Sequence, residues 1–304
     1  MARPECRGVP ANPSGKLAGY SAILVGAMLF GMWATVGKLA LNSDPNLSPI
    51  TLAWFVQAVT AVAFAPFLGR LRLSRGQWGY SSVAALLGSV TAPSLYFTGL
   101  SLTTPVNAAL LSNTEALFTV VFAFIFLKER LSTLGYLAAV SILAGAMIVT
   151  FDLGGSGADV ASRLLGNVLL VLAAVCWGGA NTVSRVVTAR HDIPSYVCMV
   201  LSLGTLLLAP IVLFSGSPLT VRTPSIPIAI FLALTGSALF TYLFYFAMRR
   251  IGALRVGAIL ATSAAFGVTI AVAFGFPLTA LQAVGGAVMA CGVVALYMSP
   301  SPKG

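Results

Sequence analysis

The chain has 304 residues, of which 58% are hydrophobic and only 8% are charged, and its mean hydropathy is +0.97. Soluble domains carry about 25% charged residues, so a soluble globular protein is excluded and a protein that uses the lipid bilayer as its solvent is indicated. The formal net charge of +10 invites a nucleic-acid partner, but the way in which the basic residues are distributed argues against one.

Apolar stretches of about 20 residues, the length that crosses a bilayer as a helix, follow one another along the chain. Runs such as Val140–Val149 do not alternate as barrel strands do, so a fold of helices only is expected. The first stretch lacks a clear cleavage site, and we interpret it as a retained helix rather than a signal peptide. Ten spans are predicted, at 17–40, 48–69, 79–101, 105–127, 133–151, 165–188, 194–214, 226–248, 253–275 and 279–298.

The basic residues predict an orientation. If the N-terminus lies inside, 14 of the 17 lysines and arginines fall on the inner side, and only Lys38, Arg163 and Arg222 fall on the outer side. The positive-inside rule therefore predicts that both termini face the cytoplasm, which agrees with an even number of spans. We expect a multi-pass protein of a bacterial inner membrane, whose basic side meets the anionic headgroups of the lipid bilayer.

The two halves of the chain are weakly similar at an offset of 147 residues. Phe30-Gly31 matches Trp177-Gly178, Lys38 matches Arg185, and Leu131-Ser132 matches Leu278-Thr279. The predicted organisation is an N-terminal tail (1–16), a first five-helix repeat (17–151), an outer linker (152–164), a second five-helix repeat (165–298) and a C-terminal tail (299–304). Because five is odd, the second repeat must enter the membrane from the opposite side. Inverted repeats of this kind are common in transporters, with the substrate site where the repeats meet.

The stretch Pro105–Thr119, continuing through Phe126–Leu131, resembles the fourth helix and closing charged turn of EamA-type transporters in the drug/metabolite transporter superfamily. The pairs Phe30-Gly31 and Trp177-Gly178 resemble small-residue breaks in the first and sixth helices of that family. The resemblance covers about 17–298 and implies two inverted five-helix units and an exporter of small metabolites. The second half departs from the family pattern at Phe276–Thr279, so a symmetric role for Glu129 is not implied.

Glu115 is the principal candidate for a functional side chain. It is the eleventh residue of the 23-residue stretch 105–127, which places a carboxylate near the middle of the membrane. An ionised group there is costly and usually faces a cavity, where it binds an ion or the substrate. The alternative is a structural Glu115 that hydrogen-bonds to neighbours such as Asn113. The register of the repeat slips by one here, so that Glu115–Phe118 matches Ser263–Phe266. Because Ser263 stands at the repeat position, a lone carboxylate is expected, suited to a cationic or zwitterionic substrate.

Other polar and aromatic residues inside the spans are weaker candidates. Amides such as Asn107, Asn113, Asn181 and Gln57 need partners in lipid, and each taken singly is better explained by hydrogen bonding between helices. Aromatic rings can stack on organic or cationic ligands but more often simply pack. The residues predicted to bind substrate or to couple transport are Glu115, Asn113, Trp33, Tyr96, Trp177, Asn181, Ser263 and Tyr245.

Lys38 and Arg185 stand at equivalent repeat positions, and inversion places them toward opposite faces of the membrane. One interpretation is that they gate opposite mouths of a pathway. The interpretation that we favour at this level is that both side chains extend to lipid headgroups.

Enzyme, channel and receptor functions are less well supported than transport. The single histidine, His191, has no catalytic set around it in the sequence, and the four cysteines lack metal-ligand spacing. We therefore expect no enzyme, no metal site, no disulfide and no cofactor. A channel would be expected to show rings of like groups or a filter loop. A receptor or assembly subunit without transport shares the fold and stays open, as do proton coupling and a monomeric or homodimeric state.

Overall fold

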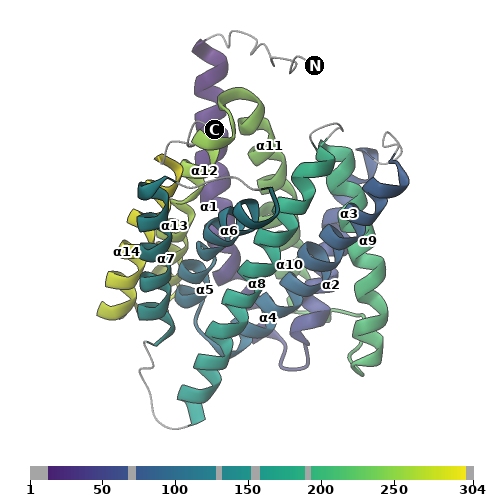
Figure 1. The fold of residues 1–304 in the computed structure, drawn as a ribbon. Coiled ribbons are helices and arrows are strands. Elements are labelled where there is room, and N and C mark those ends of the chain that lie inside the picture. Colours follow the sequence, from purple (N-terminus) through teal and green to yellow (C-terminus); the bar gives the residue numbers. More distant parts are fainter. Residues whose placement is uncertain (1–12, 68–72, 128–131, 152–157, 189–192, 299–304) are drawn as a thin grey trace.

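The computed structural model describes residues 13–67, 73–127, 132–151, 158–188 and 193–298. Within these ranges ten helical segments are long and apolar enough to cross a membrane, which confirms the predicted number. They stand side by side as one bundle, with both ends of the described chain on the same side (Figure 1). The charged turn at 128–131, His191, and most of the predicted tails and linker lie outside the described residues.

Several spans consist of two or three helical pieces in line. The first half contains α1 (Pro13–Ser43), α2 (Pro49–Phe64) with the short η1 (Ala65–Phe67), α3 (Arg75–Ala85), η2 (Leu86–Thr91), α4 (Ala92–Leu102), α5 (Pro105–Leu111), α6 (Thr114–Leu127) and α7 (Thr133–Thr150). The second half contains α8 (Ala158–Thr188), α9 (Ile193–Phe214), α10 (Ser225–Phe231), η3 (Leu232–Leu239), α11 (Phe240–Ile251), α12 (Ala253–Leu260), α13 (Ser263–Ala273) and α14 (Ala280–Met298).

Irregular positions recur in both halves, as expected for a duplicated unit. The third and eighth spans each contain a π-helical stretch, η2 and η3. The fourth and ninth spans are each interrupted by a turn, at 112–113 and 261–262. At the first turn the hydroxyls of Ser112 and Thr114 donate to the carbonyls of Ala108 and Leu111, at 2.6 Å each. Such side-chain bonds compete with the helical ladder, and they help to divide a span that the hydropathy pattern shows as one stretch.

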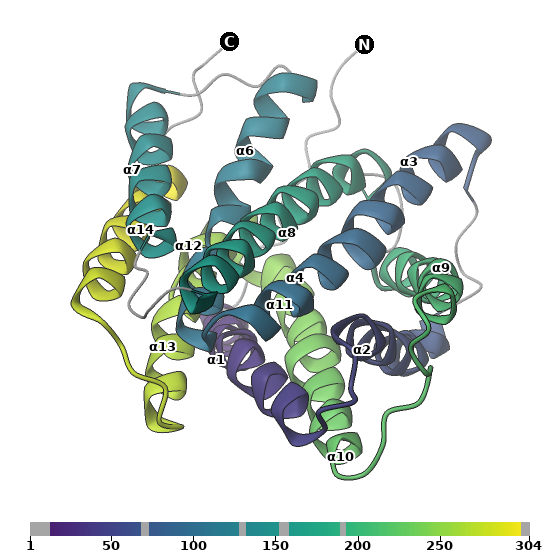
Figure 2. The ribbon, with the colours of Figure 1, turned by 90° about the horizontal axis from the view of Figure 1, so that it is seen from below.

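The two halves are inverted with respect to each other. α1 and α8 are equivalent helices, yet they run through the bundle in opposite directions (Figure 1). Seen along the bundle, α7 and α14 pair at one edge and α2 and α9 stand together at another (Figure 2). The prediction of two inverted five-helix repeats is therefore confirmed.

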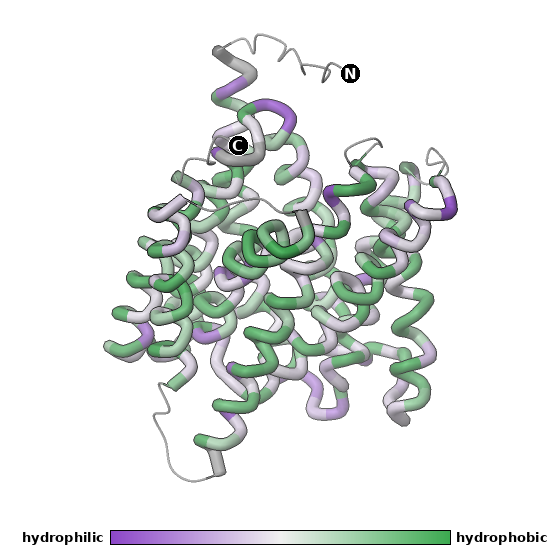
Figure 3. The backbone as a smooth tube through the Cα atoms, in the orientation of Figure 1, coloured by the Kyte–Doolittle hydropathy of each residue, from purple (hydrophilic) through white to green (hydrophobic). Residues whose placement is uncertain are grey.

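The outer surface of the bundle is apolar along the length of the helices, and the polar segments gather toward the two ends (Figure 3). Large side chains project outward without protein cover, among them Leu206 at 71% exposed and Phe214 at 92% exposed. Exposed aliphatic and aromatic groups are costly in water and favourable in lipid. The surface therefore matches a bilayer as the surrounding solvent.

The glycines at the expected breaks of the first and sixth helices have a different role. α1 and α8 continue without interruption through Gly31 and Gly178, so the expected breaks were wrong. A Cβ on Gly178 would lie 2.7 Å from the amide nitrogen of Thr119 in the second turn of α6, and a Cβ on Gly31 would lie 2.8 Å from the amide nitrogen of Gly267 on α13. Each glycine permits a close crossing between the two repeats, as small residues do in membrane helix interfaces.

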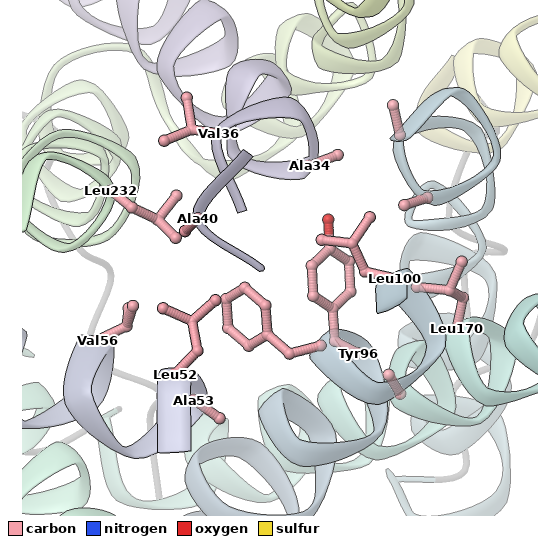
Figure 4. Close-up of a cluster of buried hydrophobic side chains, with 14 of the residues drawn as sticks. Ala34, Val36, Ala40, Leu52, Ala53, Val56, Tyr96, Leu100, Leu170 and Leu232 are labelled. Carbon is pink, nitrogen blue, oxygen red and sulfur yellow. The ribbon is translucent and has the colours of Figure 1, made fainter. Parts of the chain in front are cut away.

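One part of the apolar core of the bundle lies between α1, α2 and α4, on the side of the bundle away from the start of α1 and the end of α14. Figure 4 shows the residues of this core, which include Ala34, Val36 and Ala40 of α1, Leu52, Ala53 and Val56 of α2, and Tyr96 and Leu100 of α4. Close packing of these groups joins the three helices at one end of the molecule and leaves room for a cavity nearer to the other end.

Candidate functional site

A cavity of about 1080 Å³ lies between the two repeats. Its lining extends from Trp33 and Gln57, within α1 and α2, to Thr188 and Ile193, which end α8 and begin α9. The end of α8 and the start of α9 are on the same side of the bundle as the start of α1 and the end of α14 (Figure 1). The cavity therefore reaches from the middle of the bundle to the terminus side. Its volume is just above the usual range for sites that hold small organic ligands, which is about 300 to 1,000 Å³.

A carboxylate and an amide from different repeats meet in the wall of this cavity. The Nδ2 of Asn181 on α8 donates to Oε1 of Glu115 on α6 at 2.7 Å, and both residues line the cavity. Glu115 is partly exposed and Asn181 is exposed, so the pair is accessible from the cavity. The pair bridges the two halves at the level where the repeats cross, because Gly178 of α8 contacts α6 one turn away.

The break before α6 places Glu115 in an environment that tolerates a negative charge. The residue occupies the first turn of α6, where the helix dipole favours anions. The alternative prediction, that Glu115 hydrogen-bonds to Asn113, does not match the geometry, since the amide that donates to it is Asn181. Asn113 lies in the turn itself and also lines the cavity.

Aromatic rings form the inner end of the cavity. Trp33 stacks on Tyr96 with ring centroids 5.2 Å apart and lies 5.8 Å from Trp177. The indole N–H of Trp177 donates to the carbonyl of Gly88 at 3.1 Å, which holds this ring in place. Because Tyr96 is only 2% exposed and does not line the cavity, it supports Trp33 from behind rather than facing a ligand.

The structure brings together seven of the eight residues predicted from the sequence. Those that line the cavity are Glu115, Asn113, Trp33, Trp177, Asn181, Ser263 and Tyr245. Ser263 is almost fully buried, at 4% exposed, so only a small part of it is accessible. Their roles in binding or coupling stay predictions. Within the described residues there is no group of three or more His, Cys, Asp or Glu side chains arranged to hold a metal ion.

A buried polar network closes the opposite end of the bundle. The Nδ2 of Asn107 on α5 donates to Oδ1 of Asn167 on α8 at 3.0 Å, and the Nε2 of Gln282 on α14 donates to Oδ1 of Asn107 at 2.8 Å. The hydroxyl of Thr103 also donates to Asn167, at 2.8 Å. These groups are at most 4% exposed, and their mutual bonds satisfy them without water. The network joins the first repeat to the second beyond the aromatic rings.

Lys38 also contributes to this closed end. Its Nζ donates to the carbonyl oxygens of Leu100, Ser101 and Thr103 at 2.8, 2.8 and 2.9 Å. The favoured prediction that Lys38 extends to lipid headgroups was therefore wrong. The sequence could not reveal the alternative, because the acceptors are backbone carbonyls at the end of α4, which no residue type marks.

Two members of the closed end, Asn167 and Gln282, were not selected from the sequence. Both stand close to the ends of their spans, where an amide is ordinarily solvated and does not indicate a buried site. Gln282 also caps its own helix, because its side chain accepts from the backbone N–H of Thr279 at 2.9 Å. The available signal was the concentration of amides near the same membrane side in the fourth, sixth and tenth spans.

Two inverted five-helix units enclosing a cavity that is closed at one end define the architecture of an inverted-repeat membrane transporter. The chain belongs to the EamA-like transporter family, whose model matches residues 17–151 and again residues 164–298. The two matches are offset by 147 residues, the same offset that relates the halves of the sequence. The resemblance to EamA-type transporters is therefore confirmed.

Relatives of similar length carry transporter names. The chain is 28% identical over 301 residues to an "uncharacterized transporter" of Methanothermobacter thermautotrophicus, covering 93% of this chain and 87% of the relative. It is 24% identical over 217 residues to the "uncharacterized transporter YyaM" of Bacillus subtilis, covering 70% of each. A solved structure titled only "Crystal structure of protein" superimposes with a TM-score of 0.64 at 19% identity and covers 93% of this chain and 96% of the other, which shows a shared fold.

Proposed function

We propose that this protein is a secondary active transporter that exports small organic metabolites across the cytoplasmic membrane by alternating access. The observation that carries the proposal is the cavity between the inverted repeats, which is accessible from the terminus side and closed at the other end. By the positive-inside rule the accessible side is the cytoplasm. A cavity of this form takes up its ligand from the cytoplasm and releases it after the other end opens.

The lining of the cavity supports a substrate class of amino acids, amines or other amphiphilic organic compounds. Glu115 offers a carboxylate for an ammonium group, and the rings of Trp33 and Trp177 offer an apolar surface that also attracts cations. Arg185 lies on the same wall, one helical turn from Asn181 toward the mouth, and is suited to a carboxylate. An ion gradient, with protons as the coupling ion, is the proposed energy source.

The proposal is tested by transport into inside-out vesicles. Radiolabelled amino acids and organic amines are offered with and without an imposed pH gradient, to wild type and to the Glu115→Gln variant. We expect gradient-driven accumulation of at least one compound by wild type and its loss in the variant. Accumulation that is unchanged in Glu115→Gln would make this residue structural, and absence of transport across the panel by folded wild type would contradict the proposed substrate class.

A further inference from the structure

The three hydrogen bonds from Lys38 form a cation-binding site at the end of a helix, which we call the dock. The last turn of an α-helix leaves carbonyl groups without helical partners and carries partial negative charge. The ammonium of Lys38 on α1 binds three such carbonyls at the end of α4, at 2.8 to 2.9 Å. This contact fastens α1 to α4 at the end of the bundle where the cavity is closed.

The inverted repeat contains a second copy of both parts of this dock. Arg185 on α8 is the counterpart of Lys38, and the end of α11 is the counterpart of the end of α4. Packing of the helices supports the equivalence. A Cβ on Gly166 of α8 would lie 3.0 Å from Leu102 at the end of α4, and a Cβ on Gly19 of α1 would lie 2.8 Å from Arg250 at the end of α11.

The two copies differ in what separates their helices. α1 and α4 pack directly against each other at the closed end. In the other copy the cavity lies between α8 and α11, with Arg185 and Thr188 on one wall and Phe244 and Met248 on the other. The guanidinium of Arg250 lies 5.0 Å from the ring of Phe246 on the same helix, and its side chain is exposed. Lys38 binds backbone carbonyls at the end of α4. The repeat relation therefore assigns the backbone carbonyls at the end of α11 to Arg185 as its acceptors.

We propose that Lys38 and Arg185 are alternating latches, which rests on the proposed alternating-access function. In the state described here Lys38 binds the end of α4 and closes one side of the molecule. In the opposite state Lys38 leaves that end, α8 closes on α11, and the guanidinium of Arg185 binds the carbonyls of residues 248–252. Each cation then stabilises one of the two states, so removing either one shifts the balance toward the other.

Cysteine labelling from the two sides of the membrane tests this proposal. In a full-length chain without native cysteines, Thr241→Cys reports on access to the cavity and Ser101→Cys reports on the closed end. A membrane-impermeant maleimide is applied from each side in oriented vesicles. We expect Lys38→Met to lower labelling of position 241 and to raise labelling of position 101, and Arg185→Met to do the reverse. In each variant the ratio of the labelling rate at position 241 to the rate at position 101 should change about tenfold, which corresponds to about 1.4 kcal/mol.

Matched variants control for the loss of charge alone. Arg222→Met and Arg255→Met each remove an exposed cation, one on each side of the membrane, and should leave both labelling rates unchanged. If Lys38→Met does not fold, Arg185→Met decides alone, by a tenfold fall in the ratio of labelling at position 101 to labelling at position 241. Unchanged rates in Arg185→Met, or rates that move in the same direction at both positions, would overturn the latches.

The labelling does not need a transported compound, so the two proposals fail separately. Reciprocal shifts in a protein that transports nothing on the panel would support the latches and contradict the proposed substrate class. Transport without reciprocal shifts would support the transporter and overturn the latches.

Discussion

At the scale of single residues, the main feature of the site is the bond between Glu115 and Asn181. It joins a side chain of the first repeat to one of the second, and it lies on the wall of the cavity. A hydrogen bond to a carboxylate is stronger than one between neutral groups, and a carboxylate that loses its donor pays a larger penalty. The pair should therefore behave as a unit when either member is changed.

This coupling is measurable as a double-mutant cycle. Asn181→Ala should lower the free energy of unfolding in detergent by about 1–3 kcal/mol, and by less in a Glu115→Gln background, where the acceptor is a neutral amide. Asn113→Ala changes another amide on the cavity wall and is the control, with equal cost in both backgrounds. Equal costs for Asn181→Ala in the two backgrounds would show that the carboxylate of Glu115 binds Asn181 no more strongly than a neutral amide does.

At the scale of helices, the positions where the repeats cross depend on glycine. Gly31 and Gly178 lie where α1 and α8 contact α13 and α6, and at each site a backbone atom of the partner helix occupies the space of a Cβ. Backbone atoms cannot move aside as the end of a flexible side chain can. The same contacts hold Glu115 within reach of Asn181, so packing of the helices and geometry of the site are linked.

A single methyl group added at the crossing should therefore lower the stability of the protein. Gly178→Ala should destabilise the protein by about 1–3 kcal/mol through overpacking, measured as a lower midpoint of thermal unfolding in detergent. Gly79→Ala is the matched control, because Gly79 is also inside a helix and a Cβ there meets no atom within 4 Å. The control should be neutral or slightly stabilising, since alanine favours the helix by up to about 1 kcal/mol. A Gly178→Ala protein as stable as the control would show that the crossing can relax.

At the scale of the whole molecule, the two ends of the bundle are unlike. One end is closed by the contacts of Lys38 and by the amide network around Asn107, and the other end is reached by the cavity. In an inverted-repeat protein such asymmetry implies a second state, because exchanging the conformations of the two halves closes the open end and opens the closed one. Which end faces the cytoplasm decides whether the present state takes up or releases substrate from within the cell.

The positive-inside rule predicts that both termini lie in the cytoplasm. A green fluorescent protein fused to the C-terminus should therefore fluoresce, and alkaline phosphatase inserted at the α9–α10 connection should be active. Alkaline phosphatase fused to the C-terminus is the reciprocal control and should be inactive. The opposite pattern would place the cavity on the outer side in the present state and would remove the argument for export.

Much of the architecture is a consequence of the sequence alone. Ten spans, helices rather than strands, and a duplicated unit of five all follow from the hydropathy, length and offset of apolar stretches, because a bilayer demands long segments with internally satisfied backbones. Glu115 was also identifiable, since a carboxylate inside an apolar stretch needs a polar environment. Only the tertiary structure decided that Asn181 is its partner, that Tyr96 stands behind Trp33, and that the glycines mark crossings rather than breaks. It also decided that Lys38 binds the end of α4. These features depend on where helices distant in sequence approach one another and on backbone groups that every residue carries. Residue types along the chain mark neither of these.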